Sequence, residues 1–480
     1  MRRIARLVIP LFALAALSSF AALAAVAAPT AKGADRMWVG FHDDPSFRWV
    51  DDRESRIQLS AQQGATIMRL LVQWNVVAAR RPTNASDPFD PEYNLSDVDE
   101  AVQTAQKNDE EVMLTISGTP SWANGGKKPN VMPRRLSDFT TFAKAIAARY
   151  SGRFEGYPYV RFWSIWNEPN LNLFLTPQFN TAGKSVAPAN YAKLYAAAYA
   201  GIRAGNPLAK IAIGETSPRG HDHPGGPVIS HSPGKFAELV AKANPRLKFD
   251  AWAHHPYPSN PNSKPTQLVK WPNVSLKSLP RFEQSLNTWF HRRSTPIWIT
   301  EYAHQTRPPE ALGVPWTTQS KYISQAMALA KGYPFVQMFI WFVYQDDPGQ
   351  PWESGLYTQG GVPKATSPSH FAAAAKPLDA RSGAYSFKAG TLTPLVNLYA
   401  RRYCANDPTA TPIGMTWRIY SGTKLIAVGQ QSSSLKRDCT LDARLRFKNP
   451  IAKGKSYTAA FALNDKNGID LARKLTIRGT

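Results

Sequence analysis

The sequence predicts an α/β protein in which a (β/α)8 barrel, or TIM barrel, is followed by a C-terminal antiparallel β-sandwich domain. Between residues 37 and 375, eight short apolar segments alternate with segments of helical periodicity, which is typical of a parallel sheet covered by helices. The repeats extend over about 340 residues, which suits a barrel with long loops. We therefore expect a barrel at residues 36–378 and a β-sandwich at residues 385–480.

The barrel elements are expected from apolar periodicity and from Gly and Pro at the segment ends. The eight strands are expected at residues 37–41, 65–74, 111–116, 160–166, 210–214, 249–255, 296–301 and 335–344. The eight helices are expected at residues 53–64, 96–108, 137–150, 191–204, 234–243, 279–292, 319–331 and 370–375. A doubly wound open sheet is the alternative, but no Gly-rich phosphate-binding loop follows the first strand.

The last hundred residues show strand-like alternation instead. Six segments alternate apolar and polar residues, at 397–403, 413–420, 424–429, 441–447, 456–463 and 474–477. Cys404 and Cys439 lie here, and in an exported protein an even pair suggests one disulfide, with two free thiols as the alternative. This domain either binds carbohydrate or is a structural appendage.

The N-terminus has the pattern of a secretory signal peptide. Arg2, Arg3 and Arg6 precede an apolar stretch at residues 7–28, and residues 25–27 offer a small-x-small cleavage site. We therefore expect residues 1–28 to be removed and the protein to be secreted or to lie in the cell envelope. An uncleaved anchor is the alternative, and we expect no stable membrane insertion after cleavage.

The formal net charge of +23 requires a partner or a solvated surface to account for it. Basic chains often bind nucleic acid, but the Lys and Arg residues look scattered and no nucleic-acid motif is present, so we expect no nucleic-acid partner. A solvated basic surface is the first interpretation. Attraction to anionic cell-wall polymers or acidic glycans is the second.

Glu168 ends the aromatic fourth strand, because Pro169 has no N–H for a strand ladder. A carboxylate beside aromatic surface costs free energy unless it is used, and burial there raises its pKa, which suits a general acid. The alternative is a glutamate that only caps the next helix. Glu301 likewise comes at the end of an aromatic strand, the seventh.

A barrel gathers the carboxyl ends of its strands at one face, so we expect Glu168 and Glu301 to face each other across the barrel mouth. Paired carboxyl groups near tryptophans are the groups that glycoside hydrolysis requires. This chemistry implies no cofactor and no metal. The sequence also offers no His pair at helical zinc-binding spacing.

The two strand ends resemble the signatures of a known clan. Residues 166–170 (Trp-Asn-Glu-Pro-Asn) and 298–302 (Trp-Ile-Thr-Glu-Tyr) are similar to the acid/base and nucleophile motifs of the retaining (β/α)8 glycoside hydrolases of clan A, and the resemblance covers about residues 36–378. It implies Glu168 as acid/base, Glu301 as nucleophile, and Asn167 as a ligand of the sugar 2-hydroxyl.

The resemblance implies further site residues. Arg69 matches the strand-two arginine that supports the nucleophile, with a structural ion pair as the alternative, and His255 and Tyr257 match the His-x-Tyr of strand six. Glu215 at the end of strand five is either a substrate ligand or a loop carboxylate bonded to the backbone. Four tryptophans are expected to line sugar subsites, with Trp341 as the subsite floor: Trp74, Trp122, Trp341 and Trp352.

Within the clan, residues 119–123 (Thr-Pro-Ser-Trp-Ala) and the trailing β-sandwich resemble the β-xylosidases, α-L-iduronidases and bacterial exopolysaccharide glycosidases. Cellulase-type members usually carry a histidine after strand three, and residues 118–120 have none, which argues against a plain endoglucanase. The predicted function is hydrolysis of poly- or oligosaccharides by a secreted retaining glycosidase. The alternative is a non-catalytic glycan-binding or cell-wall protein on the same barrel, which would need neither carboxylate.

Overall fold

The structure is a computed structural model that describes residues 37–154, 157, 159–350, 352–378, 390–399, 412–434, 436, 440–464 and 470–479. The expected signal peptide, Cys404 and Cys439 lie outside these residues, so the expected disulfide stays a prediction. Within the described part of the chain, no helix combines the length and apolar character that a membrane crossing requires.

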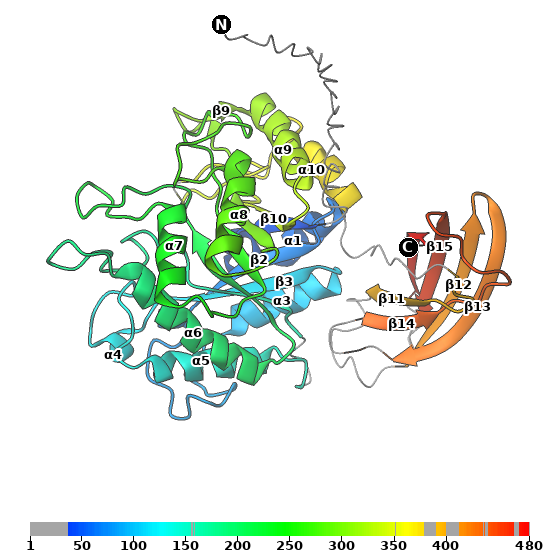
Figure 1. Ribbon diagram of the computed structural model, residues 1–480, viewed down its shortest axis with the longest axis horizontal. Coiled ribbons are helices and arrows are strands. Elements are labelled where there is room, and N and C mark those ends of the chain that lie inside the picture. The colour runs from blue at the N-terminus through cyan, green and yellow to red at the C-terminus, as the bar shows by residue number, and fades with distance from the viewer. Residues whose placement is uncertain are drawn as a thin grey trace, which may run out of the picture. The chain divides into compact units, whose positions relative to one another are not determined.

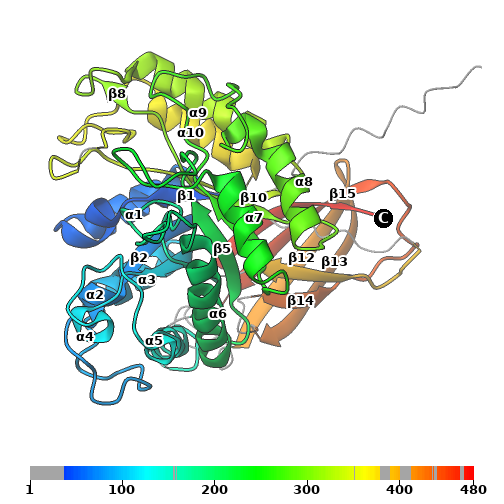
Figure 2. The same cartoon turned by 60° about the vertical axis from the view of Figure 1, so that its left-hand side comes forward.

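Eight parallel strands close into a barrel, which confirms the predicted fold class (Figures 1 and 2). Around the barrel the strands run in the order β1-β10-β7-β6-β5-β4-β3-β2, so neighbours in the chain are neighbours in the sheet. The strands are β1 (Trp38–His42), β2 (Ile67–Gln73), β3 (Glu111–Ser117), β4 (Phe162–Ile165), β5 (Lys210–Thr216), β6 (Ala251–His254), β7 (Ile297–Tyr302) and β10 (Val336–Trp341). The short strands β8 (Thr306–Arg307) and β9 (Val314–Pro315) form a separate two-stranded sheet.

Each barrel strand is followed by a helix that covers the outside of the sheet (Figure 2). These helices are α1 (Arg53–Gln62), α3 (Ser96–Lys107), α5 (Leu136–Arg149), α6 (Ala187–Gly205), α7 (Pro233–Ala243), α8 (Leu279–Trp289), α9 (Trp316–Lys331) and α10 (Ser367–Ala375). Shorter pieces lie in the connections: η1 (Pro45–Trp49), α2 (Trp74–Val77), α4 (Ser121–Asn124), η2 (Leu276–Ser278) and η3 (Lys376–Leu378). The expected helices are all found, with ends shifted by a few residues.

The barrel interior is apolar at one level and polar at the next. The apolar level contains buried side chains from seven strands: Ile67, Met113, Phe162, Ala212, Ala251, Ala253, Trp298, Met338 and Ile340. The polar level lies two residues further along β2, β3 and β4 and consists of Arg69, Thr115 and Ser164, all fully buried. Arg69 donates a hydrogen bond to the Thr115 hydroxyl, which is in turn hydrogen-bonded to the Ser164 hydroxyl. Because side chains alternate along a strand, the polar level faces the same interior and lies nearer the carboxyl ends.

The C-terminal region forms two antiparallel sheets, as predicted for a β-sandwich. One sheet pairs β11 (Leu395–Tyr399) with β14 (Thr440–Arg444). The other has the order β13-β12-β15-β16 and comprises β12 (Pro412–Ser421), β13 (Lys424–Ser434), β15 (Ser456–Asn464) and β16 (Asp470–Arg478). Buried residues of both sheets share one apolar core, which includes Leu398, Leu441, Trp417 and Phe461.

Candidate active site

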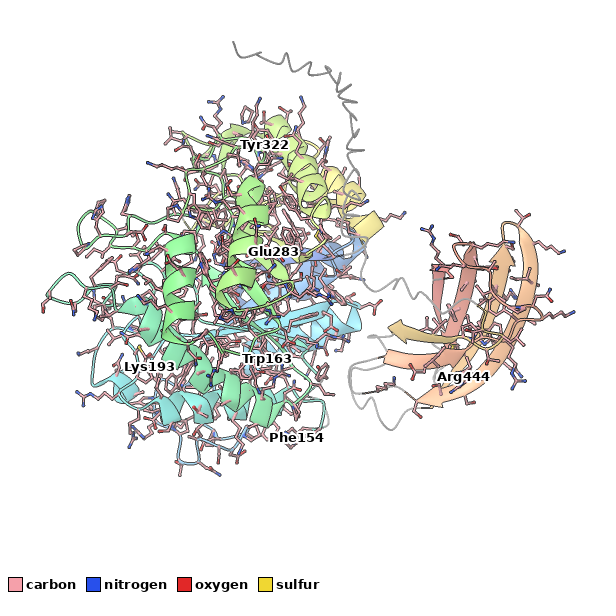
Figure 3. The ribbon with its side chains drawn as sticks, viewed as in Figure 1. Phe154, Trp163, Lys193, Glu283, Tyr322 and Arg444 are labelled. Atoms are coloured by element: carbon pink, nitrogen blue, oxygen red, sulfur yellow. The ribbon has the colours of Figure 1, made fainter. Side chains whose placement is uncertain are left out.

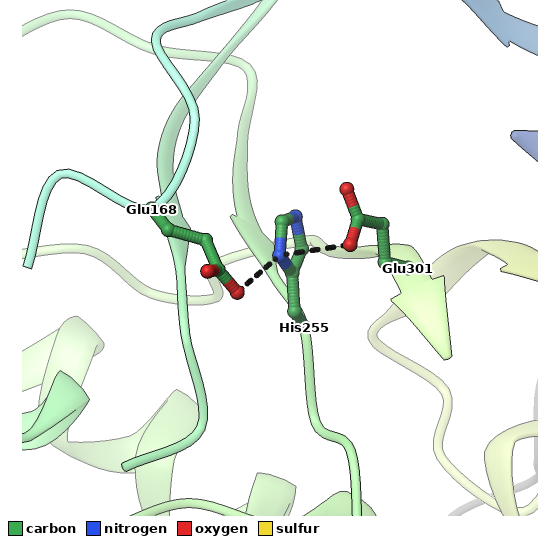
Figure 4. A group of neighbouring side chains, drawn as sticks. All are labelled: Glu168, His255 and Glu301. Carbon is green, nitrogen blue, oxygen red and sulfur yellow. Dashed lines mark hydrogen bonds and ion pairs between the residues drawn. The ribbon is translucent and has the colours of Figure 1, made fainter. Parts of the chain in front are cut away.

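Glu168 and Glu301 come together at the carboxyl ends of β4 and β7, on either side of His255 (Figure 4). A carboxylate oxygen of each glutamate and a ring nitrogen of His255 all lie within 4.8 Å of one another. Both glutamates line a cavity of about 910 Å³. This separation suits two carboxyl groups that act on one bond from opposite sides, as in a double displacement.

Glu301 is held as a carboxylate by cationic neighbours and hydroxyl donors. Arg69 Nη1 donates to its Oε1, and the Tyr257 hydroxyl donates to its Oε2 at 2.8 Å. His255 Nδ1 lies 3.5 Å from the same Oε2. Burial alone would raise the pKa of Glu301, but the charges of His255 and Arg69 outweigh burial and hold this pKa well below its usual range.

Glu168 has the opposite electrostatic character. Burial raises the pKa of its carboxyl group, and the negative charge of Glu301 adds to that rise, although the hydrogen bond from His255 Nδ1 at 3.0 Å opposes it. Two carboxyl groups whose pKa values are driven apart take different roles, the ionised one as a nucleophile and the protonated one as an acid. Glu168 also has a backbone φ of 37°, in the left-handed region where a non-glycine residue is strained.

Glu215 at the end of β5 lies beneath this pair and is fully buried. Its Oε2 accepts hydrogen bonds from His255 Nε2 at 2.8 Å, Thr300 Oγ1 at 2.7 Å and Arg69 Nη2 at 3.2 Å. Against the effect of burial, Glu301, Glu168 and Glu215 raise the pKa of His255 to about 9, so this ring is an imidazolium at neutral pH. Glu215 is therefore bonded to side chains of the site, whereas the sequence left it open between a substrate ligand and a backbone-bonded loop residue.

Arg69 connects the polar groups of the barrel mouth. Besides Glu301 and Glu215, it donates to Asn167 Oδ1 at 3.0 Å and to Thr115 Oγ1 at 3.0 Å. Asn167 is half-buried and lines the cavity, so its amide NH₂ is oriented by the bond that its oxygen makes to Arg69. The structure thus brings together seven of the residues singled out from the sequence: Arg69, Asn167, Glu168, Glu215, His255, Tyr257 and Glu301.

His42 at the end of β1 was missed from the sequence. Its Nδ1 lies 2.8 Å from Arg69 Nη1 and 3.2 Å from Glu301 Oε1, and its Nε2 lies 3.2 Å from Asp44 Oδ2. Burial and the charge of Arg69 act to lower the pKa of His42, but the carboxylates of Asp44 and Glu301 outweigh them and raise it. The available signal was the polar run of residues 42–44 directly after the first apolar segment.

Three of the four tryptophans expected at sugar subsites lie outside the two cavities beside Asn167. Trp74 and Trp341 are fully buried, and Trp122 is half-buried with its Nε1 bonded to the carbonyl oxygen of Ala78. None of the three is among the described residues that line either of the two cavities beside Asn167. Instead, the aromatic wall of the larger cavity comes from Trp49, Phe174, Phe342 and Trp352. Loops following the strands supply these rings, and of the four only Trp352 was expected from the sequence at a sugar subsite.

A second cavity of about 560 Å³ lies beside the first one. The two cavities share Leu71, Gln73, Asn167, Leu173 and Phe174 as a common wall. The wall of the second cavity is rich in polar side chains and adds Asn75, Ser117, Lys128, Asn130 and Asn172. Amide groups beside an apolar wall are typical of sites that bind polar organic ligands.

Glu168, His255 and Glu301 are also the one group of described residues with ligand atoms close enough to hold a metal ion together. This donor set fits a metal poorly, because His255 has both ring nitrogens bonded to carboxylates and is itself positively charged. Arg69 already neutralises Glu301. The arrangement suits proton transfer and charge stabilisation.

Comparison with known proteins identifies the family. Residues 30–346 match the family model described as cellulase (glycosyl hydrolase family 5). A search of curated proteins gave no match.

Similar solved structures include a family 39 glycoside hydrolase from the gut symbiont Bacteroides cellulosilyticus WH2, at 17% identity and a TM-score of 0.51, covering 86% of this chain and 81% of that one. A GH5_18 protein from Streptomyces cattleya in complex with GlcNAc has 14% identity and a TM-score of 0.52 and covers 74% and 85% of the two chains. A glucosidase from Croceicoccus marinus has 12% identity and a TM-score of 0.50 and covers 88% and 94%. These likenesses show the shared fold. Because the family match covers well over half of the sequence, the chain belongs to the cellulase family, glycosyl hydrolase family 5, and is a retaining glycoside hydrolase of clan A.

Proposed function

We propose that this chain is a secreted glycosidase that cleaves O-glycosidic bonds of poly- or oligosaccharides by double displacement, with Glu301 as nucleophile and Glu168 as acid/base. The observation that supports this assignment best is the pair of opposite pKa shifts on two carboxyl groups whose oxygens lie within 4.8 Å. An inverting mechanism needs about 6.5–9.5 Å between the carboxyl groups, to leave room for a water molecule.

In the first step, a Glu301 oxygen attacks the anomeric carbon while the bond to the leaving oxygen breaks. Glu168 gives its proton to that oxygen, so the leaving group departs as an alcohol and the sugar becomes an ester of Glu301. In the second step, the ionised Glu168 takes a proton from water, the water oxygen attacks the anomeric carbon, and Glu301 is released as a carboxylate.

The neighbours of the two glutamates have supporting roles in this proposal. Tyr257 and Arg69 hold the two oxygens of Glu301 in a fixed orientation before attack. Asn167, oriented by Arg69, presents its NH₂ to the sugar 2-hydroxyl. Phe342 and Trp352 offer aromatic faces against which a sugar ring packs.

The two adjacent cavities support a substrate of more than one sugar unit. Both catalytic candidates line the larger cavity, and Asn167, Leu173 and Phe174 separate it from the smaller one. A single sugar ring in the larger cavity would leave the polar wall of the smaller cavity unused. A chain that crosses this shared wall places further hydroxyl groups against Asn130 and Asn172.

The remaining parts of the proposal rest on the sequence. Residues 1–28 serve as a secretory signal, residues 36–378 form the catalytic domain, and residues 385–480 form an accessory domain. The net charge of +23 supports attraction to anionic polymers of the cell wall.

Aryl glycosides test the catalytic roles. Glu301→Ala and Glu168→Ala should each lower kcat/KM by at least about 10³-fold while the fold is kept, because each removes a group that acts on the reacting bond. With azide, Glu301→Ala should give a glycosyl azide of inverted configuration. The exposed Glu54→Ala should behave like the wild type. Full activity in either active-site variant, or no turnover of any glycoside by the folded wild type, would refute the proposal.

A further inference from the structure

The positive charge of this chain is concentrated in its last fifth. Residues 385–480 hold sixteen of the 57 Lys and Arg residues but only five of the 34 Asp and Glu residues. This segment therefore contributes about half of the net charge of +23, and the scattered distribution expected from the sequence holds only for the barrel. Such an asymmetry points to a polyanionic partner of the C-terminal sheets.

Three basic side chains project from the same face of the chain at the end of β14, in the sheet that pairs β11 with β14. Arg444, Arg446 and Lys448 are exposed, and they alternate with the buried Leu445 and the half-buried Phe447. Backbone bonds from Leu445 and Phe447 to the β11 side keep the chain extended beyond the end of β14. In extended chain, alternate residues are about 6.8 Å apart, so the three charges form a row. Figure 3 labels Arg444 on this sheet.

Three further basic side chains of the C-terminal region are also exposed. Lys453 and Lys455 follow in the next loop, and both are exposed. The N–H of Gly479 donates to the carbonyl oxygen of Lys455 at 3.1 Å, which places the exposed Arg478 beside it. We name Arg444, Arg446, Lys448, Lys453, Lys455 and Arg478 the basic strip.

The basic strip is not neutralised by carboxylates of the described chain. Asp442 is the one acidic residue of the described C-terminal side chains, and it forms an ion pair with Lys436 at 2.8 Å. No described carboxylate lies within ion-pair distance of any member of the strip. Lys455 packs over the ring of Tyr457, which leaves its charge in place. Exposed like charges that lack carboxylate partners repel one another and attract polyanions.

The chemistry of the strip distinguishes a polysaccharide from a nucleic acid. Single-stranded nucleic acids bind basic grooves that also present aromatic faces to the bases. Here the nearby rings of Tyr457 and Trp417 are buried in the core, and Phe447 is half-buried. The same chain carries a glycoside hydrolase domain. We propose that the basic strip binds a polysaccharide with regularly repeated acidic groups and so holds the enzyme on an anionic carbohydrate matrix.

The full-length protein and polygalacturonate provide the test. Arg444→Glu/Arg446→Glu/Lys448→Glu should weaken binding at least tenfold at low salt, because three attractive contacts become repulsive. The affinity of the wild type should also fall steeply between 50 and 300 mM NaCl, because exposed charges are screened. The matched control reverses three exposed barrel lysines, Lys107, Lys242 and Lys331, which gives the same net charge and should change binding less than twofold.

Three outcomes would overturn this inference: no binding of polygalacturonate by the wild type, an equal loss of binding in the barrel control, or tighter binding of duplex or single-stranded DNA through the same strip. Turnover of a small aryl glycoside should be equal in the strip variant and the wild type. The polymer-binding readout does not depend on catalysis. A protein that binds the polymer but hydrolyses no glycoside would count against the proposed function and leave this inference standing.

Discussion

Glu215→Gln tests whether the buried carboxylate under the site keeps His255 protonated. The substitution preserves the size of the side chain and removes one negative charge, 2.8 Å from His255 Nε2. Glu215 is fully buried, so solvent does not screen its effect. We expect the pKa of His255 to fall.

The size of this change follows from the hydrogen bond that loses its charge. A hydrogen bond to a charged group contributes about 1.5–3 kcal/mol, and one pKa unit corresponds to about 1.36 kcal/mol. The pKa of His255 should therefore drop from about 9 to between about 7 and 8. At pH 8, only about a tenth to a half of the molecules would keep an imidazolium, whereas at pH 6 nearly all would.

The assay is an NMR titration of His255 in protein labelled at histidine, together with kcat/KM for an aryl glycoside at pH 6 and pH 8. The activity ratio of variant to wild type should be lower at pH 8, by up to about tenfold, because the imidazolium that compensates the negative charge on Glu301 and Glu168 during the reaction is lost. Thr300→Val is the matched control, since it removes a donor to the same oxygen of Glu215 but leaves the charge. A His255 pKa that stays near 9 in Glu215→Gln would refute the reasoning.

Three further predictions concern pH and packing. The kcat/KM should follow a bell-shaped pH profile: it falls at low pH when Glu301, whose pKa is lowered, is protonated, and at high pH when Glu168, whose pKa is raised, ionises. Burial lowers the pKa of His254 to about 3, so between about pH 6.5 and pH 3 the unfolded chain binds a proton at this ring and the folded chain does not. The free energy of unfolding is therefore highest above about pH 6.5 and decreases as the pH falls. When the pH is lowered from 6.5 to 4.5, the free energy of unfolding measured in urea should decrease by about 2–3 kcal/mol less in His254→Gln than in the wild type. Gly201→Ala should cost about 1–3 kcal/mol, because its Cβ would lie 2.2 Å from the Thr140 carbonyl oxygen on α5.

Each of these predictions has an outcome that contradicts it. An alkaline limb that persists in Glu168→Gln would mean that another group controls that limb. An unchanged pH dependence of unfolding in His254→Gln would show that this ring is not what destabilises the fold in acid. Gly360→Ala is the control for packing, since its nearest side-chain atom lies 4.0 Å away. An equal effect at Gly360 and Gly201 would contradict the close approach of α5 and α6.

Most of the barrel could be predicted because its signals are local. Strands such as residues 111–117 are short and buried on both faces, and the helices between them show three- and four-residue spacing. The two strand ends at Glu168 and Glu301 could be predicted for the same reason, since a carboxylate directly after an aromatic strand is visible in the sequence. The barrel topology then places ends 133 residues apart in the chain next to each other.

The remainder of the site depends on tertiary contacts that local patterns do not specify. Trp341 is fully buried, and the adjacent Phe342 lines the cavity instead. Alternation of side chains along a strand does not predict which of two neighbouring residues at the strand end faces the cavity. His42 and Glu215 acquire their roles only when β1, β5 and β6 are placed around Arg69. The role of a buried charged side chain depends on the groups that pair with it, and here those groups come from strands that are distant in the sequence.

The cluster around His255 explains how one arrangement serves both steps of the proposed reaction. In the free enzyme, the carboxylates of Glu301 and Glu215 balance Arg69 and the His255 imidazolium, while the raised pKa of Glu168 favours its neutral form. When the glycosyl ester forms, Glu301 loses its charge and Glu168, having given up its proton, gains one. The negative charge therefore passes from one side of the His255 ring to the other, and Nδ1 lies within 3.5 Å of both carboxylates. Because the net charge of this buried cluster does not change, neither step has to create an uncompensated charge in a low-dielectric site.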